Sequence, residues 1–392
     1  MLWLLFYWRF EKEKWFDQLI KAIKELNKKK VNFEMFIFWR WSLESELLEI
    51  HDKNVHFFWW KPLDEIKKIL PNIDYCLMPS EFLETFWLSA LNALSWWVPV
   101  IWYKKWWLEP FIFQECNLFL AKWDTTSEKI VSIVENLAKK TNPERIKDKE
   151  LFEWKIKKLL PEYTEDARYE RFLNLSDFND SKNKKILIVS DFVNKAWWIE
   201  TYIHDVKDLL ESHWHNVILW WWILPKWFFW KRKKRIWLVL FPFNFWSSYK
   251  LKKILKKEKP DLIRFNSLLR RLWPNVIRTA QSWRKKEKNN AKIWMMYHDF
   301  WYFCSFPSEL YHIEDCKTPL TKKIFLSSWK WKNIIIKLAI WFKYYRLLPL
   351  KNVLKKYIDL HLTPSDCVTK IAQKSYNISE KKCRTFPHFI QK

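Results

Sequence analysis

Short apolar runs alternate with amphipathic segments along the chain, and this alternation predicts parallel sheets of the α/β class. Residues 16–28 illustrate the helical pattern, because apolar side chains recur there at positions 16, 19, 20, 23 and 26. Strands are expected over 4–7, 33–38, 55–58, 75–78, 98–101 and 118–121, and helices over 16–28, 42–50, 63–70, 88–95 and 127–139. These elements predict one Rossmann-like unit, with terminal helices following over 142–176.

A second unit of the same kind is expected after the polar, turn-prone residues 176–184 (SDFNDSKNK). Its strands are expected over 185–189, 216–219, 238–241, 261–265, 293–297 and 359–362, and its first helix over about 197–213. The 392 residues allow two or three domains that each bury a core. We therefore expect domains at 1–175 and 185–392, joined by a linker at 176–184. The two units share no sequence period, so they are not interpreted as a repeat.

The composition departs from that of ordinary α/β proteins, because the chain holds no glycine and 32 tryptophans. Average usage would supply about 7% glycine, and tight turns need glycine for positive φ. Tryptophans stand where such turns are expected, at Trp8, Trp15, Trp97, Trp106-Trp107 and Trp197-Trp198. We interpret most of them as glycine in the natural protein, whose gene would come from an organism that reads UGA as glycine. The alternative is a protein truly rich in tryptophan.

The net charge of +26 leaves two interpretations open. Lysine bias from an AT-rich genome would place the charge on solvated faces, whereas a functional charge would attract phosphates of nucleotide-sugars or anionic lipids. No DNA- or RNA-binding motif accompanies the charge, so nucleic acid is not expected as a partner. Residues 332–350 are apolar, aromatic and basic, and predict either a core helix or an interfacial helix that contacts an anionic membrane.

Six scattered cysteines without a C-x-x-C pair indicate reduced thiols in the cytoplasm. Cys304 and Cys316 flank one loop and could pair or bind a metal, although packing is the simpler interpretation. The N-terminus lacks a basic start, and no run of 18 apolar residues occurs, so neither a signal peptide nor a membrane span is expected. No metal-ligand cluster is evident, and we expect no metal cofactor.

The first candidate site follows the strand at 4–7, where Arg9 and Lys14 lie between Trp8 and Trp15. With glycine at 8 and 15, this segment becomes a tight turn between the carboxyl end of a strand and a helix N-terminus. Backbone N–H groups and two cations would there bind a diphosphate.

The second candidate site is the segment PSEFLETFWLSALNALSWWVPVI at 79–101, continued by WWLEPF at 106–111. Read with glycine, it resembles the donor-binding domain of retaining GT-B glycosyltransferases of the family-4 kind, the glycosyl transferases group 1 domain. Residues 8–15 resemble the G-R-x4-K-G element of that family, and Trp39-Arg40-Trp41 its G-x-G turn. The resemblance covers about residues 3–140 in the right order.

The resemblance implies roles for the matched residues. Arg9 and Lys14 would hold the donor diphosphate and stabilise the leaving nucleotide without a metal, and Glu84 would contact the donor sugar. The family usually has a second glutamate where this chain has Asn92, which can bond a ribose hydroxyl but carries no charge. The implied donor-binding set is Trp8, Arg9, Lys14, Ser80, Glu84, Phe86, Trp87, Leu88 and Asn92.

The second unit resembles the acceptor-side domain of the same enzymes over about residues 184–390. The matches are a Gly-Gly-Ile-Glu-Thr loop at 197–201, a G-H-x-V step at 214–217 and an H-D loop at 298–299. The resemblance implies acceptor-side roles for Trp197, Trp198, Glu200 and Asp299. His298 would lie near the reacting centre and form the catalytic set together with Glu84, or would orient its loop through hydrogen bonds.

We therefore expect two Rossmann-like parallel-sheet domains of the GT-B type, in the order donor then acceptor. The implied activity is transfer of a sugar, of the hexosyltransferase kind, from a nucleotide-diphosphate sugar to a glycan or lipid-linked acceptor in bacterial cell-envelope polysaccharide synthesis. The family usually runs acceptor then donor, so the chain is either a slice of a tandem enzyme or a circular permutant. Two other readings stay open: a nucleotide-binding module without transfer, and a basic protein that binds membrane or nucleic-acid surfaces.

Overall fold

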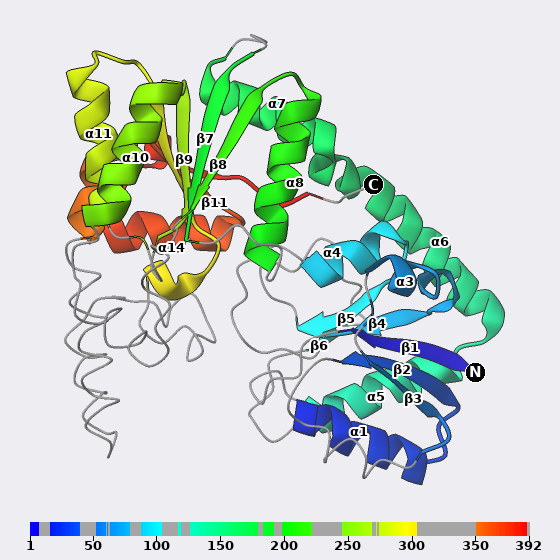
Figure 1. Ribbon diagram of the computed structural model, residues 1–392. Coiled ribbons are helices and arrows are strands. Elements are labelled where there is room, and N and C mark those ends of the chain that lie inside the picture. Colours follow the sequence, from blue (N-terminus) through cyan, green and yellow to red (C-terminus); the bar gives the residue numbers. More distant parts are fainter. Residues whose placement is uncertain are drawn as a thin grey trace, which may run out of the picture. The chain divides into compact units, whose positions relative to one another are not determined.

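The computed structural model describes residues 1–7, 16–39, 52–59, 61, 63–78, 88–103, 117–118, 126–178, 183–191, 198–221, 245–268, 272, 274–303 and 350–389. Its contacts divide the chain into two units, residues 1–164 and 165–391. Each unit is built on a parallel six-stranded sheet with helices on its faces (Figure 1). The expected fold class, two Rossmann-like α/β units, is confirmed.

The first sheet has the strand order β3-β2-β1-β4-β5-β6. Its strands are β1 (Leu2–Tyr7), β2 (Phe33–Trp39), β3 (Val55–Trp59), β4 (Tyr75–Leu77), β5 (Val100–Tyr103) and β6 (Asn117–Leu118). Its helices are α1 (Phe16–Lys28), α3 (Leu63–Lys67), α4 (Leu88–Ser95), α5 (Thr126–Lys139) and α6 (Asn142–Leu159). Helices α1 and α5 cover one face, and α3 and α4 the other (Figure 1).

The central strand of this unit is apolar because helices cover both faces of the sheet. In β1 the side chains of Leu2, Leu4 and Leu5 are fully buried. The apolar stripe of α1 supplies Leu19, Ile23 and Leu26 to the same core. The alternation seen in the sequence thus builds a core between two helical layers.

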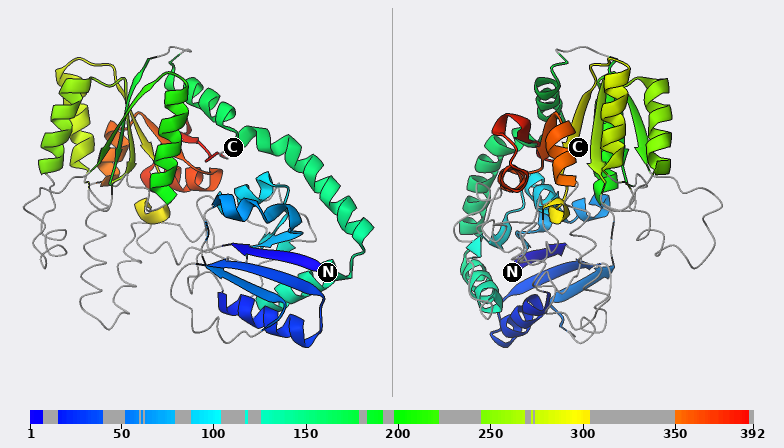
Figure 2. Two further views of the ribbon diagram at one scale, coloured as in Figure 1. Left: turned by 45° about the vertical axis from the view of Figure 1, so that its right-hand side comes forward. Right: turned by 90° about the vertical axis from the view of Figure 1, so that its left-hand side faces the viewer.

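The second sheet has the strand order β12-β11-β10-β9-β7-β8. Its strands are β7 (Lys185–Ser190), β8 (Asn216–Trp221), β9 (Leu262–Ser267), β10 (Lys292–Met296), β11 (Leu360–Thr363) and β12 (Cys383–Thr385). Its helices include α7 (Glu165–Ser176), α8 (Trp198–Ser212), α10 (Phe245–Glu258), α11 (Asn275–Lys286) and α14 (Asp366–Tyr376). Helices α10 and α11 lie together on one face, and α8 on the other (Figure 2).

Helix α7 belongs to the second unit, so the expected boundary of the first domain at residue 175 lies too far along the chain. Its Phe172 lies in the second core and packs edge-on against Trp294 of β10, with 5.6 Å between ring centroids. The expected helix at 42–50 and the expected strand at 238–241 lie outside the described residues.

One arrangement recurs at the amino ends of the strands. An aspartate just before a strand donates its N–H to the carbonyl of a residue at the start of the neighbouring strand, and its carboxylate accepts the N–H of that same residue. The carboxylate distances are 2.8 Å for Asp74 with Trp3, Asp261 with Lys185 and Asp359 with Ile293. The backbone distances are 2.9, 2.8 and 2.8 Å in the same order. These paired bonds fix the amino edge of both sheets.

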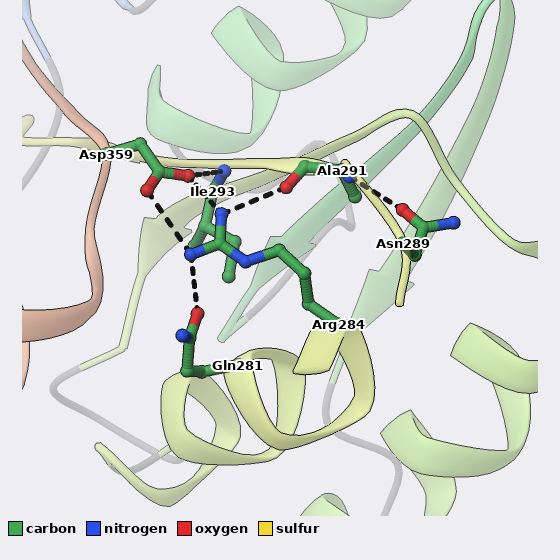
Figure 3. A network of polar contacts seen from close by, with 6 residues as sticks. All are labelled: Gln281, Arg284, Asn289, Ala291, Ile293 and Asp359. Atoms are coloured by element: carbon green, nitrogen blue, oxygen red, sulfur yellow. Dashed lines mark hydrogen bonds and ion pairs between the residues drawn. The ribbon is translucent and has the colours of Figure 1, made fainter. Parts of the chain in front are cut away.

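At Asp359 the arrangement extends into a network with the end of α11 (Figure 3). Arg284 forms an ion pair with Asp359 and donates to the carbonyl of Ala291 at 3.0 Å and to Gln281 Oε1 at 2.6 Å. Asn289 Oδ1 accepts the N–H of Ala291 at 2.6 Å. The network ties α11, β10 and the start of β11 together at the edge opposite the strand carboxyl ends.

Two tryptophans adopt the left-handed conformation at helix ends. Trp97, after α4, has φ 61°, and Trp214, after α8, has φ 65°. In each case two backbone hydrogen bonds close the helix. After α4, Val98 N–H donates to the carbonyl of Ala93 at 3.0 Å and Trp97 N–H to that of Leu94 at 3.0 Å. After α8, His215 N–H donates to the carbonyl of Leu210 at 3.1 Å and Trp214 N–H to that of Glu211 at 3.0 Å. This is the Schellman motif, whose left-handed position is usually glycine.

Candidate functional site

The order of the first sheet reverses between β1 and β4, because β2 continues on one side of β1 and β4 on the other. Leu4 and Leu5 pair with Tyr75 and Cys76, so β1 and β4 end at the same edge. The segment with Arg9 follows β1 in sequence, and the segment 79–87 follows β4. Sheets of this order bind ligands outside the carboxyl ends of the strands at this point.

Most predicted donor-binding residues lie outside the described residues, so their roles stay predictions. These are Trp8, Arg9, Lys14, Ser80, Glu84, Phe86 and Trp87. Of the remainder, Leu88 is the first residue of α4, and Asn92 lies one turn further along that helix. The half-buried Asn92 accepts a hydrogen bond at its backbone oxygen from Ser95 Oγ at 2.7 Å. The positive end of α4 therefore begins directly after residues 79–87.

Two neutral side chains lie near the ends of β1 and β4. Burial, and then the nearby Cys76 thiol, raise the pKa of Tyr7 to about 12. Burial also raises the pKa of Cys76 well above its ordinary value. Both groups are uncharged at neutral pH. Any charge of the proposed site must therefore come from the residues that follow these strands.

In the second unit, His298 lies just beyond the carboxyl end of β10, as expected from the sequence. Its Nε2 lies 3.3 Å from Asn266 Oδ1 of β9, and its ring meets Tyr202 of α8 edge-on at 4.9 Å. Burial, and then the charges of Arg264 and Arg168, lower the pKa of His298 well below its ordinary value. These contacts fit the alternative in which His298 orients its loop through hydrogen bonds. A contact of His298 with a substrate stays a prediction.

The other predicted acceptor-side residues are described in part. Glu200 is buried on α8, whereas Asp299 is half-buried directly after His298. Burial and then the negative charges of Asp299 and Asp191 raise the pKa of Tyr302. Asp299 and the residue that follows β7 therefore lie near the same phenol. Trp198 is the first residue of α8, and Trp197 lies outside the described residues.

Sequence reasoning missed a buried basic and aromatic cluster beside His298. We call it the arginine cluster; it comprises Arg168, Tyr202, Arg264, Asn266, His298, Phe386, His388 and Phe389. The available signal was Arg264, which interrupts the apolar run LIRF in β9. The partners come from distant segments, so no local pattern could have assembled them.

Within the described residues, no group of three or more His, Cys, Asp or Glu side chains is arranged to hold a metal ion. The expectation that no metal is needed is untested by this observation. Cys304 and Cys316 lie outside the described ranges. None of the helices that the structure describes combines the length and apolarity that crossing a membrane requires.

Residues 2–145 match the family model described as Glycosyl transferases group 1. This range spans the first sheet and its helices as far as the start of α6, so the first unit is similar to the domains of that family. Comparison with curated proteins gives no match.

Three solved structures show a distant likeness to the chain. The pneumococcal O-GlcNAc transferase GtfA, in complex with UDP and GlcNAc, is 19% identical, with 40% of this chain and 32% of that chain covered and a TM-score of 0.34. A mutant of S. aureus TarM, in complex with Fondaparinux, alpha-GlcNAc-glycerol and UDP, is 18% identical, covering 44% and 34%, with a TM-score of 0.35. A solute binding protein of an ABC transporter from R. palustris is 10% identical, covering 75% and 61%, with a TM-score of 0.22.

The chain spans about a third of the length of the two transferase structures. The family match over the first unit, rather than these likenesses, carries the functional conclusion.

Proposed function

We propose that the chain is a glycosyltransferase of the GT-B type that binds a nucleotide-diphosphate sugar on its first unit and transfers the sugar to a glycan or lipid-linked acceptor held by its second unit. One observation carries the proposal. The domain that matches the glycosyltransferase family has β1 and β4 ending side by side, and the segments with Arg9 and Glu84 follow these strands in sequence.

The chemistry asks two things of the chain. Cations must hold the diphosphate and stabilise the negative charge that grows on the leaving nucleotide, for which Arg9 and Lys14 are proposed. A carboxylate and an imidazole must orient the sugar and its reacting centre, for which Glu84 and His298 are proposed. Retention of configuration is proposed from the family resemblance, and a metal would not be required.

The donor site is tested by titration calorimetry after a thermal-shift panel of UDP-, GDP- and ADP-sugars has selected a nucleotide. Arg9→Ala and Lys14→Ala should each weaken binding at least tenfold, because each removes a charge-assisted contact to the diphosphate. Lys28→Ala is the matched control, since Lys28 is highly exposed in the last turn of α1. Equal affinities of all three variants and the parent chain would refute the site.

Asn92 offers a gain-of-function test of the same site. Glutamate is the usual family residue there, and its carboxylate would accept a stronger hydrogen bond from a ribose hydroxyl. Asn92→Glu is expected to tighten nucleotide binding severalfold, with no change for inorganic pyrophosphate, which lacks the ribose.

A binding module without transfer is the second candidate, favoured by the proposed donor-then-acceptor order of the units. Both candidates predict donor binding that depends on Arg9. Only the enzyme predicts release of nucleoside diphosphate, on addition of acceptor, that disappears in Glu84→Gln. Donor binding without such release would leave the binding module as the function.

We also propose a cytoplasmic location with peripheral contact to an anionic membrane, supported by the net charge of +26 and by residues 332–350, which lie outside the described residues. Cosedimentation with vesicles of phosphatidylglycerol, compared with neutral phosphatidylcholine, tests the contact. Equal binding to both vesicles, or none to either, would exclude it.

Finally, we propose that Trp97 and Trp214 stand where the natural protein has glycine, through a UGA codon read as glycine. Both have positive φ at the Schellman position, where a side chain meets steric cost. Lys30, Lys259 and Lys288 also have positive φ, so the conformation supports the proposal only together with the family resemblance at 97 and 214. Peptide mass spectrometry of protein from its natural source decides between glycine and tryptophan at each position.

A further inference from the structure

The second unit buries two arginine side chains in its interior. Arg168 of α7 is 3% exposed and Arg264 of β9 is 1% exposed. Both guanidinium groups donate to the hydroxyl oxygen of Tyr202, Arg264 at 2.6 Å. Two guanidinium groups therefore converge on a single hydroxyl oxygen. Neither arginine forms an ion pair with a carboxylate in the part of the chain that the structure describes.

Several donors of this cluster have no acceptor among the described residues. They are Arg168 Nη1, Arg264 Nε and Nη1, and Asn266 Nδ2. Buried polar groups in folded proteins are almost always hydrogen-bonded, and exceptions commonly mark the place of an ion or a water molecule. Buried charge without a counter-charge is more costly still. The cluster is thus rich in donors, and no carboxylate of the described residues forms an ion pair with its arginines.

The surrounding aromatic rings do not supply the negative charge that the two arginines lack. The guanidinium carbon of Arg168 lies 3.9 Å from the ring centroid of Phe386 and 5.2 Å from that of Phe389, and the carbon of Arg264 lies 5.5 Å from that of Tyr202. Such contacts stabilise a cation modestly, but ring faces do not neutralise its charge. They do hold the two guanidinium groups in fixed orientations, which favours a ligand that needs pre-set donors.

The two imidazoles of the arginine cluster, His298 and His388, are neutral. His298 and His388 stack at 5.8 Å, and each meets Tyr202 edge-on, His388 at 4.3 Å. Burial, together with the two arginines, lowers the pKa of both histidines well below the ordinary value. The positive charge of the cluster therefore belongs to the arginines. Asn266, which lies 3.3 Å from His298, extends the set of donors toward the carboxyl ends of β9 and β10.

We propose that an anionic group, a phosphate or a carboxylate of a bound ligand, lies between Arg168 and Arg264 as their missing counter-ion. The planar guanidinium fork matches the paired oxygens of both groups, and Asn266 Nδ2 supplies a further donor. The site uses residues of the second unit alone, so it stands or falls independently of donor binding on the first unit.

The test is titration calorimetry of the full chain with inorganic phosphate, pyrophosphate and acetate at constant ionic strength. The parent chain should bind at least one of them, and Arg264→Gln and Arg168→Gln should each weaken binding at least tenfold. Arg278→Gln is the matched control, because Arg278 is exposed on α11 in the same unit. A second arm uses vesicles with and without phosphatidic acid. Binding to the vesicles that depends on Arg264 assigns the phosphate to a lipid, whereas binding of the free anion alone assigns it to a soluble ligand.

Tyr202→Phe serves as a further variant in case the arginine variants do not fold, because it keeps the ring and removes only the shared hydroxyl. This variant should fold and bind the selected anion severalfold more weakly, since both guanidinium groups lose a fixed partner. The proposal is overturned if the parent chain binds none of the three anions at millimolar concentration and no phosphatidic acid vesicles. Equal weakening in Arg278→Gln and Arg264→Gln would overturn it as well, because the binding would then be general attraction to a basic surface.

Discussion

Trp214→Gly should stabilise the second unit, although the change removes the largest side chain and introduces the most flexible residue. The left-handed conformation that Trp214 adopts, with φ 65°, costs a residue with a Cβ about 1–2 kcal/mol. Glycine relieves this cost but gains freedom in the unfolded chain, which offsets about 0.4–1 kcal/mol. The side chain is 68% exposed. An unfolded chain itself covers roughly 10–40% of such surface, so folding buries little more of this ring.

The net expectation is a gain of about 1 kcal/mol in the free energy of unfolding, or roughly 2–4 °C in melting temperature. Urea unfolding followed by far-ultraviolet circular dichroism measures it without relying on indole fluorescence. The matched control is Trp246→Gly, in the first turn of α10 on the same unit, where the ring is 47% exposed and stacks on Tyr249 at 6.1 Å. Glycine within a helix costs about 0.5–1 kcal/mol, so this control should lose stability. A loss in Trp214→Gly as large as that in the control would refute the reasoning.

Three further outcomes are expected. Asp359→Ala should cost about 1–2 kcal/mol in urea unfolding, because it leaves the N–H of Ile293 without its acceptor and Arg284 without its counter-charge. Asp359→Asn, which keeps an oxygen, should cost less, and equal losses would contradict this account. Burial lowers the pKa of His361 to about 3 from its ordinary 6.5, so its contribution to stability is complete above pH 6.5 and is lost as the pH falls toward 3. The loss from His361 alone should reach about 2 kcal/mol at pH 5, and His361→Gln should make the pH profile of the urea midpoint less steep. Burial raises the pKa of Cys383 to about 12 and that of Cys76 still further, so neither thiol should be alkylated in the folded chain at pH 8; rapid labelling of either peptide, read by mass spectrometry, would show the burial to be wrong.

The regular part of the fold could be predicted from the sequence because it depends on local pattern. The helices at 16–28 and 88–95 begin and end where their apolar periodicity does. The predicted helix at 63–70 instead ends at Lys67 and is followed by a 3-10 turn at Leu70–Asn72. Pro71 contributes to the break, since proline has no N–H with which to continue the helical hydrogen bonds.

The site could be predicted only in part. Topology brings the ends of β1 and β4 together, as the motif order suggested, and His298 lies at a strand end as expected. The buried arginines could not be foreseen, because Arg168 and Arg264 meet at Tyr202 across 34 and 62 residues of sequence. Contacts between distant segments produce no periodic pattern in the sequence. The one local indication was Arg264, a charged residue inside an apolar strand.

The aspartates that lock the amino ends of both sheets have a consequence for engineering. The paired hydrogen bonds of Asp74, Asp261 and Asp359 lie at one rim of each sheet. Changes in the loops that follow the carboxyl ends of the strands should therefore leave these paired hydrogen bonds in place. Each of the two sheets could therefore serve as a scaffold for the selection of new binding specificities.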